Sequence, residues 1–190
     1  MRAPIFLAVA CLVLAGAAPA QATRADLDAV HDTSSIDQSG SRVLQDTVRI
    51  HAPSAAVWKA LTDQASYRAW IAPASYIDFR IGGRIDVAFD PKSKPGDPVD
   101  LSQEITAYVP GRVIAFRNLK NLGLAGGAAY GRLAIVLELT PVGGGNTDVS
   151  LSQVGYGAGR DFDALYDFFN SHNPEYLSDL KAFVERKPKG

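Results

Sequence analysis

The stretch from Arg160 to Arg186 constrains the fold most strongly, because its pattern predicts one long amphipathic helix. Its apolar residues recur at steps of three or four positions, which places them on a single helical stripe. Acidic residues stand at its start and basic residues at its end, where each sign of charge interacts favourably with the helix dipole. A stripe so rich in aromatic rings requires a broad apolar surface to pack against, and it consists of Phe162, Leu165, Phe169, His172, Tyr176, Leu180 and Phe183.

Pro174 lies in the middle of this stretch and predicts a local distortion. Proline lacks a backbone N–H and crowds the carbonyl group four residues before it, so the helix should kink or break there. Asn173 followed by Pro174 is also typical of a new helix start. Because the apolar stripe keeps its phase across residues 162–183, the sequence favours one kinked helix over two helices. We expect residues 162–169 to face a cavity and residues 176–183 to anchor the helix to a sheet.

Residues 43–156 predict an antiparallel sheet that supplies such a surface. Short segments rich in β-branched residues alternate between apolar and polar side chains, and turn residues such as Gly82 and Gly83 separate them. Hairpins at this spacing indicate one sheet with one buried face. Two short helices are expected after the first strand, around residues 54–61 and 67–70. The fold class is therefore α+β, with about six to seven strands at residues 43–50, 76–81, 84–89, 101–109, 113–118, 132–140 and 147–156.

Residues 1–22 predict a secretory signal peptide. Arg2 precedes an apolar run at residues 5–15, which is too short to span a bilayer. Small residues then offer cleavage sites near Ala20 or Ala22, and the sole cysteine, Cys11, lies inside the apolar run. We therefore expect a periplasmic or secreted protein whose mature chain holds together without disulfides.

Residues 23–42 are polar and predict a flexible lead before a single domain at residues 43–187. Removal of the signal peptide leaves 18 of the 19 Lys and Arg residues against 20 Asp and Glu residues, because only Arg2 is lost. This near balance gives no electrostatic argument for a nucleic-acid partner or an anionic membrane. No second apolar run reaches spanning length, so we expect no membrane span.

A series of segments carries a resemblance to a known superfamily. In the first of them a strand leads through Ala52 and Pro53 into a helix with Val57 and Trp58. In this order, the segments at residues 48–63, 67–70, 79–84, 105–116 and 137–151 resemble the START-like, or SRPBCC, superfamily. They are most similar to the branch named after the activator of the ninety-kilodalton heat-shock protein's ATPase, and the resemblance covers residues 43–187.

The resemblance implies a helix-grip fold, in which a curved antiparallel sheet wraps around the long C-terminal helix and leaves a cavity between them. Members of the superfamily bind hydrophobic small molecules, act as cyclases or hydrolases, or serve as co-chaperones. They share no catalytic motif, so the resemblance carries no active site over to this chain. The co-chaperone role concerns a cytosolic partner, and the predicted export argues against it.

The sequence contains no recognisable catalytic motif or metal site. His31, His51 and His172 lack partners at metal-ligand spacing, and neither H-E-x-x-H nor C-x-x-C occurs. The G-x-S-x-G nucleophile elbow is also missing. The glycine-rich segment at residues 123–131 fits no phosphate-binding fingerprint, and we interpret it as a surface loop or as a lid at a cavity mouth. We expect no cofactor.

The candidate ligand-binding residues are inward-facing side chains of the sheet and the long helix. Gln153 shares the phase of Val149 and Leu151, so it should face inward, where a carboxamide needs a hydrogen-bond partner or a ligand. Asp78 and Arg80 should instead pair on the outer face. The apolar residues among these candidates could equally fill a packed core that leaves no cavity. The full set is Trp70, Phe79, Phe116, Leu137, Gln153, Phe162, Leu165, Tyr166 and Phe169.

Three functions are compatible with the sequence. The leading hypothesis is an exported protein that holds an unidentified hydrophobic or amphipathic small molecule between sheet and helix, because no strong acid–base pair is evident. A cyclase or hydrolase would use Gln153, Tyr166 or His172 in the same cavity. A structural or partner-binding domain would require the cavity to be closed by side chains. The sequence does not indicate the oligomeric state.

Overall fold

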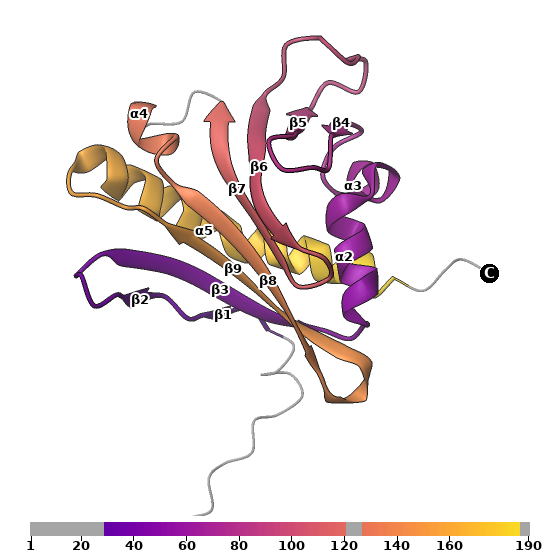
Figure 1. Ribbon diagram of the computed structural model, residues 1–190, viewed down its shortest axis with the longest axis horizontal. Coiled ribbons are helices and arrows are strands. Elements are labelled where there is room, and N and C mark those ends of the chain that lie inside the picture. Colours follow the sequence, from indigo (N-terminus) through magenta and orange to yellow (C-terminus); the bar gives the residue numbers. More distant parts are fainter. Residues whose placement is uncertain (1–28, 121–126, 187–190) are drawn as a thin grey trace, which may run out of the picture.

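The computed structural model describes residues 29–120 and 127–186, and its largest element is a curved antiparallel sheet (Figure 1). The strands follow the order β1-β3-β9-β8-β7-β6-β5-β4, and β2 also pairs with β3. The sheet and the helix that crosses it confirm the predicted α+β helix-grip fold, whereas the predicted signal peptide lies outside the described residues. The strands are β1 (His31–Asp32), β2 (Ser35–Ile36), β3 (Arg42–Ile50), β4 (Ala74–Ile77), β5 (Arg84–Ala88), β6 (Leu101–Val109), β7 (Val113–Lys120), β8 (Ala134–Val142) and β9 (Asn146–Val154).

Two short strands lie within the segment that the sequence predicts as a flexible lead. Both β1 and β2 pair antiparallel with β3. The turn that leads from β2 into β3 is held by Asp37, whose carboxylate accepts backbone N–H bonds from Ser39 and Ser41 at 2.8 and 2.9 Å. Residues 31–36 therefore extend the edge of the sheet, which has nine strands where the sequence predicts six to seven.

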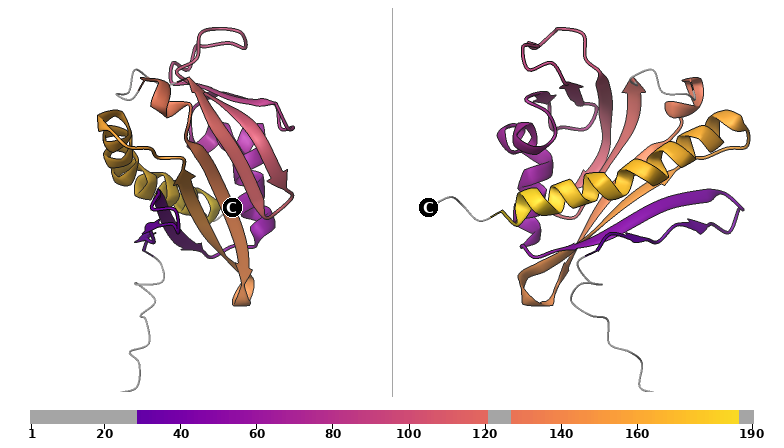
Figure 2. Two further views of the ribbon diagram at one scale, coloured as in Figure 1. Left: turned by 60° about the vertical axis from the view of Figure 1, so that its left-hand side comes forward. Right: turned by 180° about the vertical axis from the view of Figure 1, so that it is seen from behind.

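The helices cover one face of the sheet and one of its ends. α5 runs along this face, and α2 and α3 lie near the C-terminal end of α5 (Figure 2). Asp63 separates α2 from α3 and caps the latter, since its carboxylate accepts the backbone N–H of Ser66 at 2.8 Å. The helices are α2 (Ser54–Thr62), α3 (Gln64–Trp70), α4 (Gly127–Tyr130) and α5 (Arg160–Val184), and the short turn η1 (Gly143–Gly145) joins β8 to β9.

The strand predicted at residues 76–81 is shorter than expected, because β4 ends at Ile77. The chain then turns tightly, with the backbone N–H of Gly83 donating to the carbonyl of Arg80 at 2.8 Å. Gly82 adopts a positive φ of 78°, a conformation that residues other than glycine rarely adopt. The predicted pair of Asp78 and Arg80 is present on the exposed surface of this turn, with Nε and Oδ2 2.9 Å apart.

α5 is one continuous helix of 25 residues that passes through Pro174. The expectation that residues 176–183 anchor the helix is confirmed, because Leu177 and Leu180 pack in the main core. The expectation that residues 162–169 face the cavity holds only for Phe168 and Phe169, whereas Phe162 and Leu165 pack in an apolar cluster with Leu44. The residues of α5 that line the cavity lie at positions 168–179, a stretch that contains the proline and overlaps the core contact of Leu177.

Replacement of Pro174 by alanine should raise the free energy of unfolding by about 1 kcal/mol. Alanine restores the backbone N–H that proline denies to the carbonyl of Asn170, and it is the best helix former. Chemical denaturation followed by circular dichroism measures the change. Alanine at the exposed Glu175 is the matched control and should stay within about 0.5 kcal/mol of the parent. A destabilised Pro174→Ala variant would show that α5 depends on the geometry imposed by the proline.

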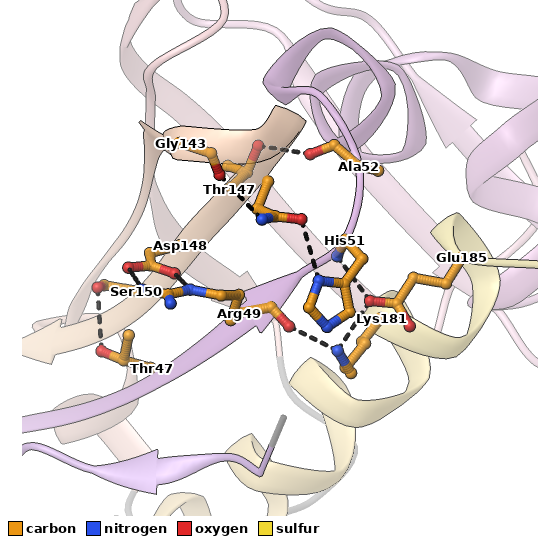
Figure 3. A network of polar contacts seen from close by, with 11 residues as sticks. Thr47, Arg49, His51, Ala52, Gly143, Thr147, Asp148, Ser150, Lys181 and Glu185 are labelled. Carbon is orange, nitrogen blue, oxygen red and sulfur yellow. Dashed lines mark hydrogen bonds and ion pairs between the residues drawn. The ribbon is translucent and has the colours of Figure 1, made fainter. Parts of the chain in front are cut away.

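A polar network fixes the C-terminal end of α5 to the sheet (Figure 3). Glu185 accepts the backbone N–H of His51 at 2.7 Å and a bond from Lys181 Nζ at 2.8 Å. Lys181 Nζ also donates to the carbonyl of Arg49 at 2.6 Å, and Arg49 forms a two-pronged ion pair with Asp148 of β9 at 2.7 and 2.8 Å. These contacts therefore fix the C-terminal end of α5, which follows the residues that line the cavity.

Candidate functional site

A cavity of about 340 Å³ lies between the sheet and α5. Its walls come from α3, α4 and α5 and from the strands β5 to β9. Figure 1 shows how α5 crosses the sheet. The volume is at the lower end of the range typical of small-molecule sites. The cavity lies where the helix-grip fold implies one.

Most of the cavity wall is apolar. Phe116, Ile135 and Leu151 face it from the adjacent strands β7, β8 and β9, and Phe116 lies directly opposite Ile135 in the ladder. Tyr130 of α4 stacks with Phe169 of α5, with ring centroids 6.2 Å apart, so α4 forms part of the wall. The remaining aromatic and aliphatic lining residues are Tyr67, Trp70, Ile71, Val87, Phe89, Leu101, Phe168 and Tyr176.

Two carboxamide side chains, on β6 and β7, form the first polar group in the cavity wall. Gln103 Nε2 donates to Asn118 Oδ1 at 3.1 Å. Asn118 is only 2% exposed, and its Nδ2 has no hydrogen-bond partner among the described residues. The oxygen of this amide is thus occupied, while its NH₂ group remains as a donor at the cavity wall.

The amide oxygen of Gln153 on β9 also accepts a hydrogen bond from another side chain of the protein. The hydroxyl of Tyr156 donates to Gln153 Oε1 at 2.9 Å, which holds the amide oxygen. Gln153 is 2% exposed and lines the cavity. The residue therefore faces inward, as the strand pattern predicts.

Asn173 on α5 adds a third carboxamide and lies beside a buried acid. Its Nδ2 is buried and lacks a hydrogen-bond partner within residues 29–120 and 127–186. The acid is Asp46 of β3, which is 1% exposed and lies near Asn173 without a well-aligned hydrogen bond. Burial raises the pKa of Asp46 to about 6, the charge of Asp32 adds to the increase, and the amide of Asn173 opposes it.

The cavity lining offers neutral donors rather than a paired acid and base. The charged side chain among the described lining residues is Asp179, which is exposed at the rim. His172 is also exposed, and its Nδ1 donates to the carbonyl of Phe168 at 2.7 Å. Burial raises the pKa of Tyr130 to about 12 and that of Tyr176 well above its ordinary value, so both remain neutral phenols.

Four of the nine residues predicted to bind a ligand line the cavity: Trp70, Phe116, Gln153 and Phe169. Trp70 lies at the end of α3, and its indole N–H donates to the carbonyl of Ala60 at 2.9 Å, which fixes the ring. These four come from α3, β7, β9 and α5, and the fold brings them together around one space.

Leu137 and Phe79 are predicted site residues that lie elsewhere. Leu137 follows Ile135 by two positions on the same face of β8, but it is packed in the main core with residues of α2. Phe79 lies in the turn after β4, where its ring packs edge-on against Trp58 at a centroid distance of 5.6 Å. Both side chains fill packed parts of the protein.

The first turns of α5 also lie away from the cavity, which corrects the prediction for Phe162, Leu165 and Tyr166. Phe162 and Leu165 are buried in an apolar cluster with Leu44. Tyr166 packs against the same cluster and lies beneath the guanidinium of Arg42, 4.9 Å from its ring centroid. This cluster fills the space between the start of α5 and the sheet, so the cavity begins only at Phe168.

Several lining residues are missing from the prediction, although the sequence contains a signal for some of them. Asn118 follows Phe116 by two positions and so shares its inward face. Asn173 follows Phe169 by four positions and therefore lies on the same face of the helix. Tyr130 carries no such signal, because it belongs to a helix of four residues within the glycine-rich segment. Residues 121–126 of that segment lie outside the described residues, so the choice between lid and surface loop stays a prediction.

Neither a metal cluster nor a membrane helix is found in the described ranges. Residues 29–120 and 127–186 contain no group of three or more His, Cys, Asp or Glu side chains that could hold a metal ion. Within the same part of the chain, no helix has both the length and the apolar character needed to cross a membrane.

Comparisons with known proteins place the chain in a family. The model of the family described as Activator of Hsp90 ATPase homolog 1-like protein matches residues 51–185. A search of curated protein sequences finds no match. The crystal structure of CalU16 from Micromonospora echinospora is similar, with a TM-score of 0.58 and 18% identity over 83% of this chain and 87% of that one.

Two further solved structures share the fold. The Aha1 dimer from Colwellia psychrerythraea has a TM-score of 0.59 and 18% identity, over 78% of this chain and 98% of that one. PFC0360w, an HSP90 activator from Plasmodium falciparum, has a TM-score of 0.51 and 16% identity, over 71% and 94%. The match to the family model over most of the chain, on a sheet that curves around one long helix, shows that the protein belongs to the Activator of Hsp90 ATPase homolog 1-like family.

Proposed function

We propose that this protein is an exported binding protein that holds a small hydrophobic or amphipathic molecule in the cavity between its sheet and α5. The observation that carries the proposal is the cavity itself, about 340 Å³ in volume, with aromatic and aliphatic walls and a few buried polar groups. A space of this kind is the usual form of a small-molecule site. A core closed by side chains would leave no such volume.

The arrangement of polar groups favours binding over catalysis. The buried carboxamides hold their positions through hydrogen bonds within the protein, as Gln103 and Tyr156 do for Asn118 and Gln153. An acid–base catalyst would need a titratable group within reach of the buried space. The titratable side chains of the lining are neutral buried phenols or exposed rim groups, among them His172 and Asp179.

Filling the cavity should weaken the binding of a neutral apolar dye. Ile135 faces the cavity from β8, so Ile135→Trp would place an indole in the space and lower the affinity for Nile red more than tenfold. Fluorescence titration of the purified mature protein measures the affinity. The dye should show blue-shifted, enhanced emission with the parent protein.

The adjacent residue provides the control for this experiment. Val136 lies on the opposite face of the same strand, so Val136→Trp adds the same ring outside the cavity and should leave the affinity within about twofold. Circular dichroism establishes that both variants are folded. Equal affinities of Ile135→Trp and the parent would show that the dye does not enter this cavity, and a parent that binds no dye would contradict the proposed function.

Export rests on the N-terminal sequence and has its own test. The apolar run at residues 5–15 and the small residues before Ala20 and Ala22 support cleavage by a signal peptidase. Cell fractionation followed by mass spectrometry of the intact chain should find a periplasmic or secreted protein that starts at Gln21 or Thr23. A full-length chain confined to the cytoplasm would contradict export. Native mass spectrometry of the exported protein would also reveal a ligand that co-purifies with it.

A further inference from the structure

We infer that the cavity selects an uncharged ligand with a carbonyl oxygen, such as a ketone, ester or amide, which accepts a hydrogen bond from the side-chain NH₂ group of Asn118. This inference rests on the proposed function and specifies the chemical class of its ligand. Asn118 is 2% exposed, lines the cavity from β7, and leaves its Nδ2 without a partner among the described residues. A buried donor of this kind needs an acceptor, and the cavity is the space that can hold one.

The direction of the hydrogen bonds leaves a donor at the cavity wall. Gln103 occupies the oxygen of Asn118, and the hydroxyl of Tyr156 occupies the oxygen of Gln153. The amide of Asn118 therefore directs its NH₂ group to the cavity, whereas the NH₂ group of Asn173 lies beside the carboxylate of Asp46. A ligand that offers only acceptors complements this pattern, whereas a ligand that offers only donors does not.

The charge of the lining favours a neutral acceptor over a carboxylate. A buried carboxylate is stable only beside a cation or several donors. The described residues that line the cavity include no Lys or Arg, and their charged side chain, Asp179, is negative. A carboxylate ligand would lose its hydration and meet repulsion from Asp179, while a neutral carbonyl group would lose much less hydration on entry.

Three probes of matched size separate the contributions of shape, acceptor and charge. They are methyl hexyl ketone, the matching alkene in which a methylene group replaces the carbonyl oxygen, and octanoate. The parent protein should bind the ketone about tenfold more tightly than the alkene or octanoate, since one buried hydrogen bond contributes about that factor. Two-dimensional NMR of the labelled mature protein measures each affinity, and saturation with the ketone should shift the side-chain amide signals of Asn118.

The variant Asn118→Leu removes the donor while keeping a similar volume. It should lose the preference for the ketone and bind the alkene at least as tightly, because the buried carbonyl group would then have no donor. Its affinity for the alkene should not fall. Asn170→Leu is the matched control, because Asn170 is exposed on α5 and does not line the cavity. It should keep the tenfold preference of the parent. If Asn118→Leu does not fold, the shift of the Asn118 amide signals in the parent still tests the donor.

The outcomes distinguish this inference from the proposed function. A parent that binds octanoate or the alkene as tightly as the ketone, or an Asn118→Leu variant that keeps the preference, would overturn the inference. So would an Asn118 amide signal that does not move at saturation. If these results appear while Nile red still binds in the cavity, the proposed function stands without the assigned ligand class. If neither Nile red nor any of the three probes binds, the proposed function itself is wrong.

Discussion

The variant Asp46→Asn should be more stable than the parent by about 2 to 3 kcal/mol at pH 8, and by much less at pH 4. Asp46 is 1% exposed, and its Oδ2 has no hydrogen-bond partner in the described part of the chain. Burial raises its pKa from 3.8 to about 6, and the nearby charge of Asp32 contributes to the increase. At pH 8 the parent must therefore hold a poorly compensated carboxylate between β3 and α5, which asparagine replaces with a neutral group.

The sign of the pH dependence follows from the direction of the shift. The folded state binds the Asp46 proton more tightly than the unfolded state, so this group lowers the stability of the parent as the pH rises from about 4 to about 6. Above that window the loss is constant. The variant lacks the titrating group, so the difference in stability between variant and parent should grow across the same window.

Urea denaturation at several pH values between 4 and 8 measures this difference. Asp167→Asn provides the control, because Asp167 lies exposed on α5 and its replacement should change the free energy of unfolding by no more than about 0.5 kcal/mol at any pH. A constant difference between Asp46→Asn and the parent from pH 4 to pH 8 would contradict the assigned pKa. A variant less stable than the parent at pH 8 would show that the carboxylate has a role in the fold that its contacts do not reveal.

The overall fold could be predicted from local patterns, because the apolar residues of most strands and helices recur at the spacing typical of that element. Alternation in β8 and β9 predicts which side chains face α5, and the stripe of α5 predicts which side receives them. The edge strands β1 and β2 could not be predicted in this way. Each has two residues, too few to show a period, and all four side chains are exposed.

The cavity could be predicted only in part, because a pattern assigns a side chain to a face but not to a packed or an empty region of that face. Ile135 and Leu137 share one face of β8 and both belong to the main core, yet only Ile135 also lines the cavity. The distance between α5 and the sheet decides between these environments. That distance depends on clusters formed by residues far apart in sequence, such as Leu44 and Leu165.

The variants Leu165→Ala and Phe169→Ala should separate these two environments, since both residues lie on α5 and only Phe169 lines the cavity. Leu165 is 0% exposed in the cluster that holds the start of α5, so its truncation should lower the free energy of unfolding by about 2 to 5 kcal/mol. Its folded form should bind Nile red within about twofold of the parent affinity, because the cavity wall is unchanged.

Phe169→Ala should show the opposite balance. Phe169 is partly exposed and contacts the cavity, so its loss should reduce the affinity for Nile red more than Leu165→Ala does and should destabilise the fold less. Thermal unfolding and dye titration, both at a temperature where each variant is fully folded, measure the two effects. If Leu165→Ala impaired binding as strongly as Phe169→Ala, the start of α5 would belong to the ligand site after all. Equal stability losses with unequal affinities would instead indicate that the ring of Phe169 both anchors the helix and contacts the ligand.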